Sequence, residues 1–409
     1  MNDVRMRGFA ERTSVEDAVA WVDRQAAWIV PEVVPLSEAR GRVLAEPVVS
    51  RIDVPTYPRA MMDGYAVRAA DTMGAGDYDP LPLRIVGTSL PAAPANVTVG
   101  EGEAVRIMTG APMPEGADAV LPVEQTQPGS STDSVLVLAA VARGRHIGQV
   151  GEDIRRGREV LTRGRVLRPQ DLGVLSSIGL SEVSVIGAPR VAILVTGNEV
   201  LPAGSKPADY RIADANGPML SALVERDHGC VTDCRYVPDD PDAIAEALRA
   251  DADIILVSGG SSVGEEDHTP QLVRKLGMLA VHGIAMRPSS PAGMGTIGHR
   301  QVFLLPGNPV SCLCAYDFFA GRLIRQRAGH RADWPYRQQQ LPLAEKLSSA
   351  IGRTDYARVR IQNGQVIPLA IRGASILTST TRADGFVIVP EASEGFAEGT
   401  PVTVYRYDA

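Results

Sequence analysis

Three short apolar runs constrain the fold of this chain more than any other feature. They are VAILV at 191–195, DIILV at 253–257 and VFLL at 302–305. Each is short and almost wholly apolar, as expected of parallel strands buried on both faces. Helix-like patterns lie between the first two runs, at 218–229 and 241–250. This alternation predicts βαβ units and a three-layer α/β domain, whose ligands bind beyond the carboxyl ends of the strands.

The chain has 409 residues, which exceeds the size of one ordinary core, so several domains are expected. The α/β pattern spans 188–332. Gly and Pro punctuate short Val- and Leu-rich runs over 46–145, which predicts a β-rich domain. Strand-like alternation over 333–409 predicts a small C-terminal β barrel or sandwich, of which we expect the barrel. We expect residues 1–45 and 146–187 to form one discontinuous domain of helices and linkers. The predicted fold class is therefore α/β plus β, in a multidomain chain.

Three helices are predicted outside the α/β pattern. Thr13 and Ser14 precede acidic residues at the offset of a capping box, and apolar residues then recur at helical spacing. A first helix is therefore expected near 14–28. The segment LSEARGRVLA predicts a second short helix at 36–45, and a third is expected near 169–177.

Composition limits the classes of partner. The net charge of −7 argues against nucleic acid, because binding to phosphate backbones needs a basic surface. No stretch approaches the roughly 20 apolar residues that span a bilayer, and the N-terminal segment lacks the apolar run of a secretory signal. The four cysteines lack zinc spacing and are too few for a disulfide framework. We expect a cytoplasmic protein without membrane or nucleic-acid partners.

The first candidate motif is VTGNEV at 195–200, where the first apolar strand ends. Thr196 and Gly197 can present a hydroxyl and backbone amides to an anion, and Glu199 can hold a cation. An ordinary turn between a strand and a loop would explain this motif equally well.

A second motif, SGGSSVGEEDHTP at 258–270, follows the second apolar strand directly. Adjacent glycines flanked by serines allow a backbone nest around phosphate, and the acidic residues offer oxygen ligands for magnesium. Alternatively, the acidic residues only favour the start of a helix at 269–270. The candidate phosphate-binding residues are Ser258, Gly259, Gly260, Ser262 and Gly264, and the candidate metal ligands are Glu265 and Asp267.

Two further motifs are ambiguous when taken singly. The third apolar strand is followed by the motif PGNP, which consists of Pro306, Gly307, Asn308 and Pro309. This motif is typical either of an anion-binding site or of a well-capped start of a helix. RAMMDGYAV at 59–67 contains the carboxylate of Asp63. Cleft-lining and turn-forming roles both fit that aspartate.

Seven motifs follow one another along the chain: AMMDGYAV, RIMTGAPMPEGADAV, GEDI, VTGNE, DDP, SGGSSVGEED and PGNP. Together they resemble the molybdopterin molybdenumtransferase family, which includes the catalytic domain of gephyrin. The resemblance covers nearly the whole chain. It implies an α/β domain of the molybdopterin-binding type and an elongated homodimer of four-domain subunits. It also implies an active cleft between the α/β domain of one subunit and the β-rich second domain of the other.

The activity implied by this resemblance is insertion of molybdate into adenylylated molybdopterin, with release of AMP, to form the molybdenum cofactor. Asp63, Thr109, Glu199 and Asp239 match positions that the family uses functionally. We expect Mg²⁺, or another divalent cation, to be held by some of Glu199, Asp239, Glu265 and Asp267 and to polarise the adenylyl phosphate. The adenylyltransferase and acceptor molybdoenzymes are further candidate partners.

The chain departs from the family pattern at Ser261, where valine is common, at His268, where tyrosine is frequent, and in the loop at 287–291. Where the family usually has Lys-Pro-Gly-Lys-Pro, this chain has Arg287-Pro288-Ser289-Ser290-Pro291. Arg287 can replace lysine as an anion clamp, but serine supplies no charge. Two alternative functions stay open, a molybdopterin adenylyltransferase and a diverged paralogue that binds the cofactor or serves as a scaffold.

Overall fold

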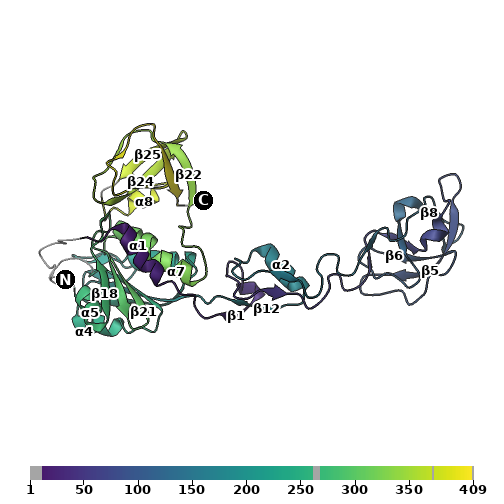
Figure 1. The fold of residues 1–409 in the computed structure, drawn as a ribbon, viewed down its shortest axis with the longest axis horizontal. Helices are drawn as coiled ribbons and strands as arrows, with labels where there is room; N and C mark the ends of the chain where they lie inside the picture. The colour runs from purple at the N-terminus through teal and green to yellow at the C-terminus, as the bar shows by residue number, and fades with distance from the viewer. Residues whose placement is uncertain (1–11, 261–267, 371–372, 408–409) are drawn as a thin grey trace. The chain divides into compact units, whose positions relative to one another are not determined.

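The computed structural model describes residues 12–260, 268–370 and 373–407 (Figure 1). The chain forms two compact units, one of Met1–Glu32 with Val185–Ala409 and the other of Val33–Ser184. Each unit has its own sheets and its own hydrophobic core.

The first unit contains a six-stranded mixed sheet. Its strands, in sheet order, are β16 (Cys230–Val237), β13 (Arg190–Thr196), β17 (Ile254–Ser258), β21 (Arg300–Leu305), β20 (Gly293–Ile297) and β18 (Met278–His282). The first four are parallel to one another, whereas β20 and β18 run antiparallel to their neighbours. The three apolar runs therefore form adjacent buried parallel strands, β13, β17 and β21, as predicted.

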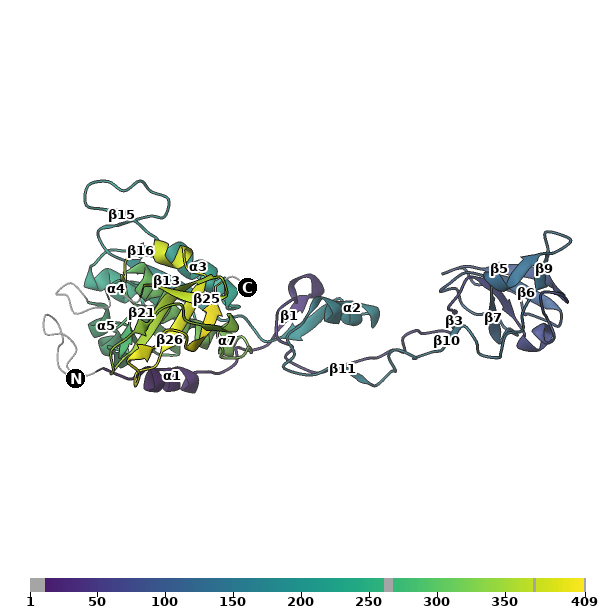
Figure 2. The same ribbon diagram turned by 90° about the horizontal axis from the view of Figure 1, so that it is seen from above.

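Helices cover both faces of this sheet (Figure 2). Ile193 and Val195 join a core cluster that includes side chains of α1, α3, α6 and α7, whereas Ala192 and Leu194 join one that includes α4 and α5. Successive residues of a strand point to opposite faces, so this division confirms the three-layer α/β domain. The helices are α1 (Val15–Arg24), α3 (Asn216–Arg226), α4 (Pro241–Ala247), α5 (Thr269–Leu276), α6 (Pro309–Ala315), the π-helical turn η4 (Tyr316–Ala320) and α7 (Gly321–Arg327).

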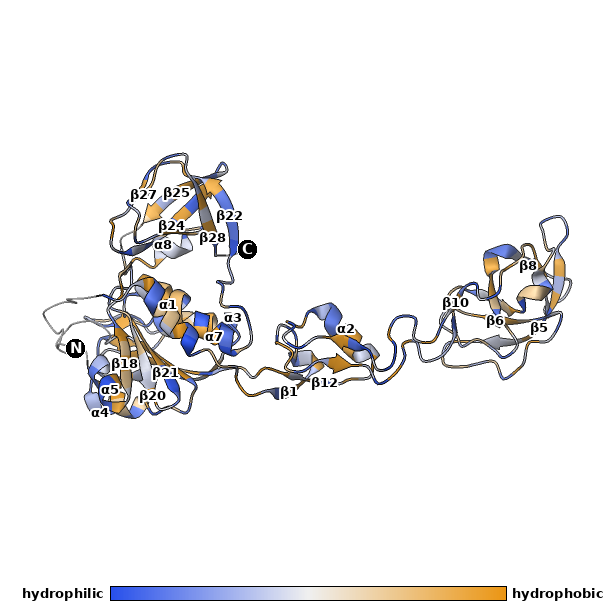
Figure 3. Cartoon of the chain, in the orientation of Figure 1, coloured by the Kyte–Doolittle hydropathy of each residue, from blue (hydrophilic) through white to orange (hydrophobic). Residues whose placement is uncertain are grey.

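Helix α1 is shorter than predicted and belongs to the first unit. The Ser14 side chain accepts a hydrogen bond from Asp17 N at 3.0 Å, which caps the helix, and the helix ends at Arg24 instead of near residue 28. It contains both hydrophobic and hydrophilic residues (Figure 3), and Trp21 and Val22 are buried in the core of the α/β domain. The expected grouping of residues 1–45 with 146–187 therefore does not extend to α1.

The C-terminal residues form a β-rich domain, and one of its strands comes from the α/β sequence. In sheet order the strands are β19 (Met286–Arg287), β24 (Thr354–Gln362), β26 (Gly385–Val389), β28 (Pro401–Arg406) and β22 (Arg337–Pro342), with β25 (Gln365–Ala370) also paired to β24. The pair β23 (Leu347–Ser348) and β27 (Gly395–Phe396) and the short helix α8 (Thr378–Thr381) complete it. Strand β19 pairs in parallel with β24, with Arg287 opposite Asp355, so the two domains share one sheet.

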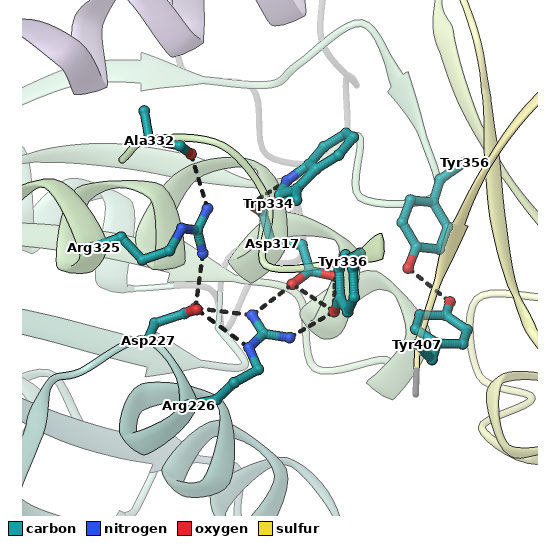
Figure 4. A network of polar contacts seen from close by, with 9 residues as sticks. All are labelled: Arg226, Asp227, Asp317, Arg325, Ala332, Trp334, Tyr336, Tyr356 and Tyr407. Carbon is teal, nitrogen blue, oxygen red and sulfur yellow. Dashed lines mark hydrogen bonds and ion pairs between the residues drawn. The ribbon is translucent and has the colours of Figure 1, made fainter. Parts of the chain in front are cut away.

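A buried polar network lies where α3, η4 and α7 meet the segment that leads to β22 (Figure 4). Arg226 forms ion pairs with Asp227 and Asp317, both fully buried, and Arg325 forms a second ion pair with Asp227. Tyr336 donates to Asp317 at 3.0 Å. Buried charges are tolerated when they are paired in this way.

The second unit is β-rich, as predicted for 46–145. Its largest sheet runs β7 (Ala119–Pro122), β4 (Gly64–Val67), β6 (Glu103–Ile107), β5 (Leu81–Ser89), β9 (Ser134–Val137) and β8 (Thr126–Pro128). The remaining elements are the pairs β1 (Glu32–Pro35) with β12 (Glu182–Val185), β2 (Val48–Val49) with β11 (Glu159–Leu161) and β3 (Arg59–Ala60) with β10 (Ile147–Gly148), the helix α2 (Pro169–Ser177), and the 3₁₀ turns η1 (Leu36–Glu38), η2 (Ala69–Thr72) and η3 (Val123–Gln125). Helix α2 agrees with the helix predicted near 169–177.

The helix predicted at 36–45 is wrong, because only the single 3₁₀ turn η1 forms there. Gly41 N donates to Leu167 O at 2.8 Å, and Leu44 N donates to Arg165 O at 2.9 Å. Two turn-like bonds remain, from Ala39 N to Leu36 O and from Arg42 N to Ala39 O, but Gly41, Leu44 and Ala45 donate to distant parts of the chain. Long-range pairing has overridden the local helical pattern.

Candidate active site at the carboxyl ends of the parallel strands

A cavity of about 620 Å³ lies at the carboxyl ends of β13, β17 and β21. Ligands of open α/β sheets bind at this edge. The predicted site residues that line it are Thr196, Gly197, Glu199, Asp239, Ser258, Gly259, Gly260, Pro306, Gly307, Asn308 and Pro309. The structure thus brings together three motifs that span more than 100 residues of the sequence. Ser262, Gly264, Glu265 and Asp267 lie outside the described residues.

Glycine is required where the loops after β13 and β17 meet. Gly259 has a φ of +100°, and a Cβ there would lie 2.6 Å from the carbonyl oxygen of Thr196. Gly260 also has a positive φ, of +55°. The backbone of the second motif can therefore approach the first motif closely. Gly259 N donates to Leu305 O at 3.0 Å, and Gly260 borders the cavity without a side chain.

Two carboxylates, Glu199 and Asp239, line the cavity from neighbouring loops. Asn198 N donates to Asp239 Oδ2 at 3.2 Å, and Asp239 N donates to Asn198 Oδ1 at 3.3 Å. This reciprocal pair fixes the loop after β16 against the loop after β13. Within the described ranges, no three His, Cys, Asp or Glu side chains form a ready metal site. Mg²⁺ is commonly held by one or two carboxylates together with substrate phosphates, and this pair fits that mode of binding.

Asp214 and Asn216 also line the cavity, although the sequence analysis did not single them out. Asn216 Nδ2 donates to Ser258 Oγ and to Gly307 O, both at 2.8 Å, so one side chain connects the second motif to PGNP. Asp214 accepts from the amides of Asn216 and Gly217 at the start of α3. The sequence ADANG just before a helix could have shown this capping role.

A second cavity, of about 370 Å³, adjoins the first and shares Pro291, Pro306 and Asn308 with it. Three arginines line the second cavity: Arg12, Arg287 and Arg353. Residues of the loop that departs from the family pattern also border it. Such a cationic, hydroxyl-rich cavity suits an oxyanion.

Arg287 lies in this second cavity, and its guanidinium is already engaged. It donates to the fully buried carboxylate of Asp355 through Nε, at 3.0 Å, and through Nη2. Ser289, in the place of the family's glycine, is buried with a φ of +88° and donates to Ser311 O at 2.5 Å. Ser290 Oγ is buried and, in the described part of the chain, has no hydrogen-bond partner.

Asp63 and Thr109 lie together in the second unit. Asp63 Oδ1 accepts from Thr109 N at 2.7 Å and from Thr109 Oγ1 at 2.8 Å. The backbone hydrogen bond, followed by the hydroxyl bond, holds the pKa of the exposed Asp63 below its usual value. Gly64 is needed next to it, because a Cβ there would lie 2.0 Å from Leu121 O. The pair therefore presents a fixed, ionised carboxylate to solvent.

Family models match three consecutive parts of the chain. They describe the MoeA N-terminal region (domain I and II) at 13–179, a probable molybdopterin binding domain at 192–326 and the MoeA C-terminal region (domain IV) at 340–407. The chain belongs to the MoeA family. Within the described part of this MoeA protein, no helix is long and apolar enough to cross a membrane.

Relatives of this MoeA family member match it over most of their length. Molybdopterin molybdenumtransferase 2 of Mycobacterium tuberculosis is 34% identical over 92% of this chain and 95% of its own. A putative molybdopterin biosynthesis protein of Methanocaldococcus jannaschii is 32% identical over 91% of each chain. The crystal structure of a molybdopterin biosynthesis MoeA protein from Pyrococcus horikoshii has a TM-score of 0.83 at 31% identity, covering 98% of this chain and 100% of its own.

Proposed function

We propose that this protein is a molybdopterin molybdenumtransferase that inserts molybdate into adenylylated molybdopterin and releases AMP. The observation that carries the proposal is the first cavity. It combines the loop of Gly259 and Gly260, which has no side chains at these positions, with two carboxylates at the carboxyl ends of three parallel strands. Relatives named molybdopterin molybdenumtransferase support the transfer of molybdenum in this proposal.

In this proposal the first cavity holds the adenylylated pterin. The amide of Gly260 donates to phosphate oxygens, while Asn216 fixes the second motif and PGNP relative to each other. Glu199 and Asp239 would hold Mg²⁺ against the phosphates. When bound, the cation withdraws charge from the phosphate that is cleaved. The acidic residues at 265–267, which lie outside the described residues, are still predicted to be ligands of Mg²⁺.

The second cavity is the proposed site for molybdate. Molybdate is a tetrahedral dianion, and Arg353 with the serine-rich loop offers cationic and hydroxyl donors beside the pterin cavity. The shared residues Pro291, Pro306 and Asn308 would place the oxyanion next to the dithiolene that receives the molybdenum.

We also propose a cytoplasmic homodimer in which Asp63 and Thr109 of one subunit complete the cavity of the other. The support is chemical: Asp63 is exposed, ionised and held by Thr109. Such a carboxylate can orient a cation or a substrate donor group. Delivery from an adenylyltransferase and transfer to acceptor molybdoenzymes would complete the sequence of reactions.

A reconstitution experiment tests the proposed function. The protein is incubated with adenylylated molybdopterin, Mg²⁺ and molybdate, and a cofactor-free molybdoenzyme is then added. Recovery of molybdoenzyme activity only when all components are present is expected. Tight binding of the adenylylated pterin without recovery of activity would instead indicate a protein that binds the cofactor precursor without converting it.

A further inference from the structure

One buried carboxylate joins the two domains that border the second cavity. Asp355, on β24, is fully buried. It accepts two hydrogen bonds from Arg287 on β19 and one from Ser349 Oγ at 2.6 Å. Arg353 Nε lies 3.5 Å from its Oδ1 atom. Three side chains, one from the α/β sequence and two from the C-terminal domain, thus converge on one carboxylate.

The two arginines are not equivalent. Arg287 donates to Asp355 through both Nε and Nη2. The side chain of Arg287 is therefore restrained, and its charge is neutralised by Asp355. Arg353 is 37% exposed and forms only the longer ion pair with Asp355. In the described residues its Nε has no hydrogen-bond partner. Of these two arginines, Arg353 is therefore the one held less firmly by Asp355, and its guanidinium can still adjust to a ligand in the cavity.

We infer that Asp355 is a positioning residue for the oxyanion in the second cavity, an inference that rests on the function proposed above. Asp355 does not line the cavity and does not touch the ligand. It fixes the side chain of Arg287 at the edge of the cavity and orients Arg353 toward the anion. Long arginine side chains lose much conformational freedom when they bind, and a carboxylate that holds them beforehand reduces that loss.

Removing the charge of Asp355 either strengthens or weakens oxyanion binding, and the direction of this change distinguishes two possible roles of the residue. If Asp355 acted only as a counter-charge, removing its charge would strengthen oxyanion binding, because an uncompensated Arg287 would face the cavity. If Asp355 acts by positioning, Asp355→Asn weakens binding instead. An asparagine has one acceptor oxygen where the aspartate serves several donors, so both arginines lose their fixed orientation.

The experiment measures molybdate binding and steady-state AMP release with the full-length protein. For Asp355→Asn we expect the molybdate Kd and KM to rise about tenfold, with kcat and the KM for adenylylated molybdopterin nearly unchanged. Asp384→Asn is the matched control, since Asp384 is an exposed aspartate of the same domain that binds Ile361 N. It should leave the molybdate KM unchanged.

Three outcomes would overturn the inference: tighter molybdate binding, an unchanged molybdate KM, or a loss of kcat alone, which would indicate a merely structural role. If Asp355→Asn does not fold, Ser349→Ala removes one donor to Asp355 and should raise the molybdate KM about threefold, whereas no change would contradict the inference. Failure of the wild-type protein to bind molybdate would count against the proposed function and not against Asp355 specifically.

Discussion

Asp63 accepts two hydrogen bonds from one residue, Thr109, through the same oxygen atom, Oδ1. Both bonds favour the ionised carboxylate, and they hold its pKa below the usual 3.8 although the side chain is exposed. A depressed pKa contributes stability that is present above pH 3.8 and is lost as the pH falls through the lower folded-state value. At neutral pH the pair is fully formed.

Thr109→Val should therefore raise the pKa of Asp63 toward its usual value. The valine keeps the backbone donor and removes the hydroxyl donor, so the shift should be partial. Titration of the Asp63 carboxyl carbon by NMR in both proteins measures it. Identical titration midpoints would show that the hydroxyl does not hold the carboxylate.

Glu199→Gln should increase the Mg²⁺ concentration needed for half-maximal AMP release, by about tenfold, because one of two proposed carboxylate ligands becomes neutral. Glu225→Gln is a suitable control, since Glu225 lies near the end of α3 and does not line the first cavity. An equal Mg²⁺ requirement in wild-type protein and Glu199→Gln would exclude Glu199 as a ligand.

Gly259→Ala should disturb the contact between the first two motifs. The new methyl group would meet Thr196 O at 2.6 Å in a backbone conformation that alanine rarely adopts. We expect a loss of about 2 kcal/mol or more in unfolding free energy, with a raised KM for the adenylylated pterin. Gly204 also has a positive φ, of +80°, but has open space around it. Gly204→Ala should therefore lower the unfolding free energy by only about 1 kcal/mol and leave the KM unchanged. Equal effects of the two substitutions would refute the close-contact explanation.

Asp317→Asn should lower the unfolding free energy of the first unit by about 3 kcal/mol, because the largely buried guanidinium of Arg226 loses one of its two carboxylate partners. Tyr336→Phe removes one donor to the same carboxylate and should cost about 1 kcal/mol. Asp251→Asn breaks the exposed ion pair with Arg190 and should change stability much less than Asp317→Asn does. Urea unfolding compares the three variants. A loss for Asp317→Asn no larger than that for Asp251→Asn would contradict the role assigned to the network.

The α/β architecture and most of the first cavity could be predicted because both depend on local pattern. Buried strands are apolar throughout, and motifs that follow parallel strands meet at one edge of the sheet, so Thr196, Gly259 and Gly307 could be grouped from the order of strands and motifs. The helix predicted at 36–45 does not form, because the backbone of this segment pairs with residues 165–167. No local sequence signal shows this pairing.

Contacts between distant segments account for the site features that the sequence analysis missed. The pairing of Arg287 with Asp355 arises because β19 joins the sheet of the C-terminal domain, and Ser375 reaches the first cavity from that domain. No sequence pattern around these residues points to their partners. Asp214 differs, because its capping position before α3 was readable in the sequence but could not by itself be assigned to a cavity.

The decisive measurement for the proposed reaction is the rate of AMP release from adenylylated molybdopterin in the presence of Mg²⁺, with and without molybdate. We expect molybdate to accelerate AMP release and Mg²⁺ to be required. AMP release at the same rate without molybdate, or no release under any of these conditions, would contradict the proposal that this protein inserts molybdate with release of AMP.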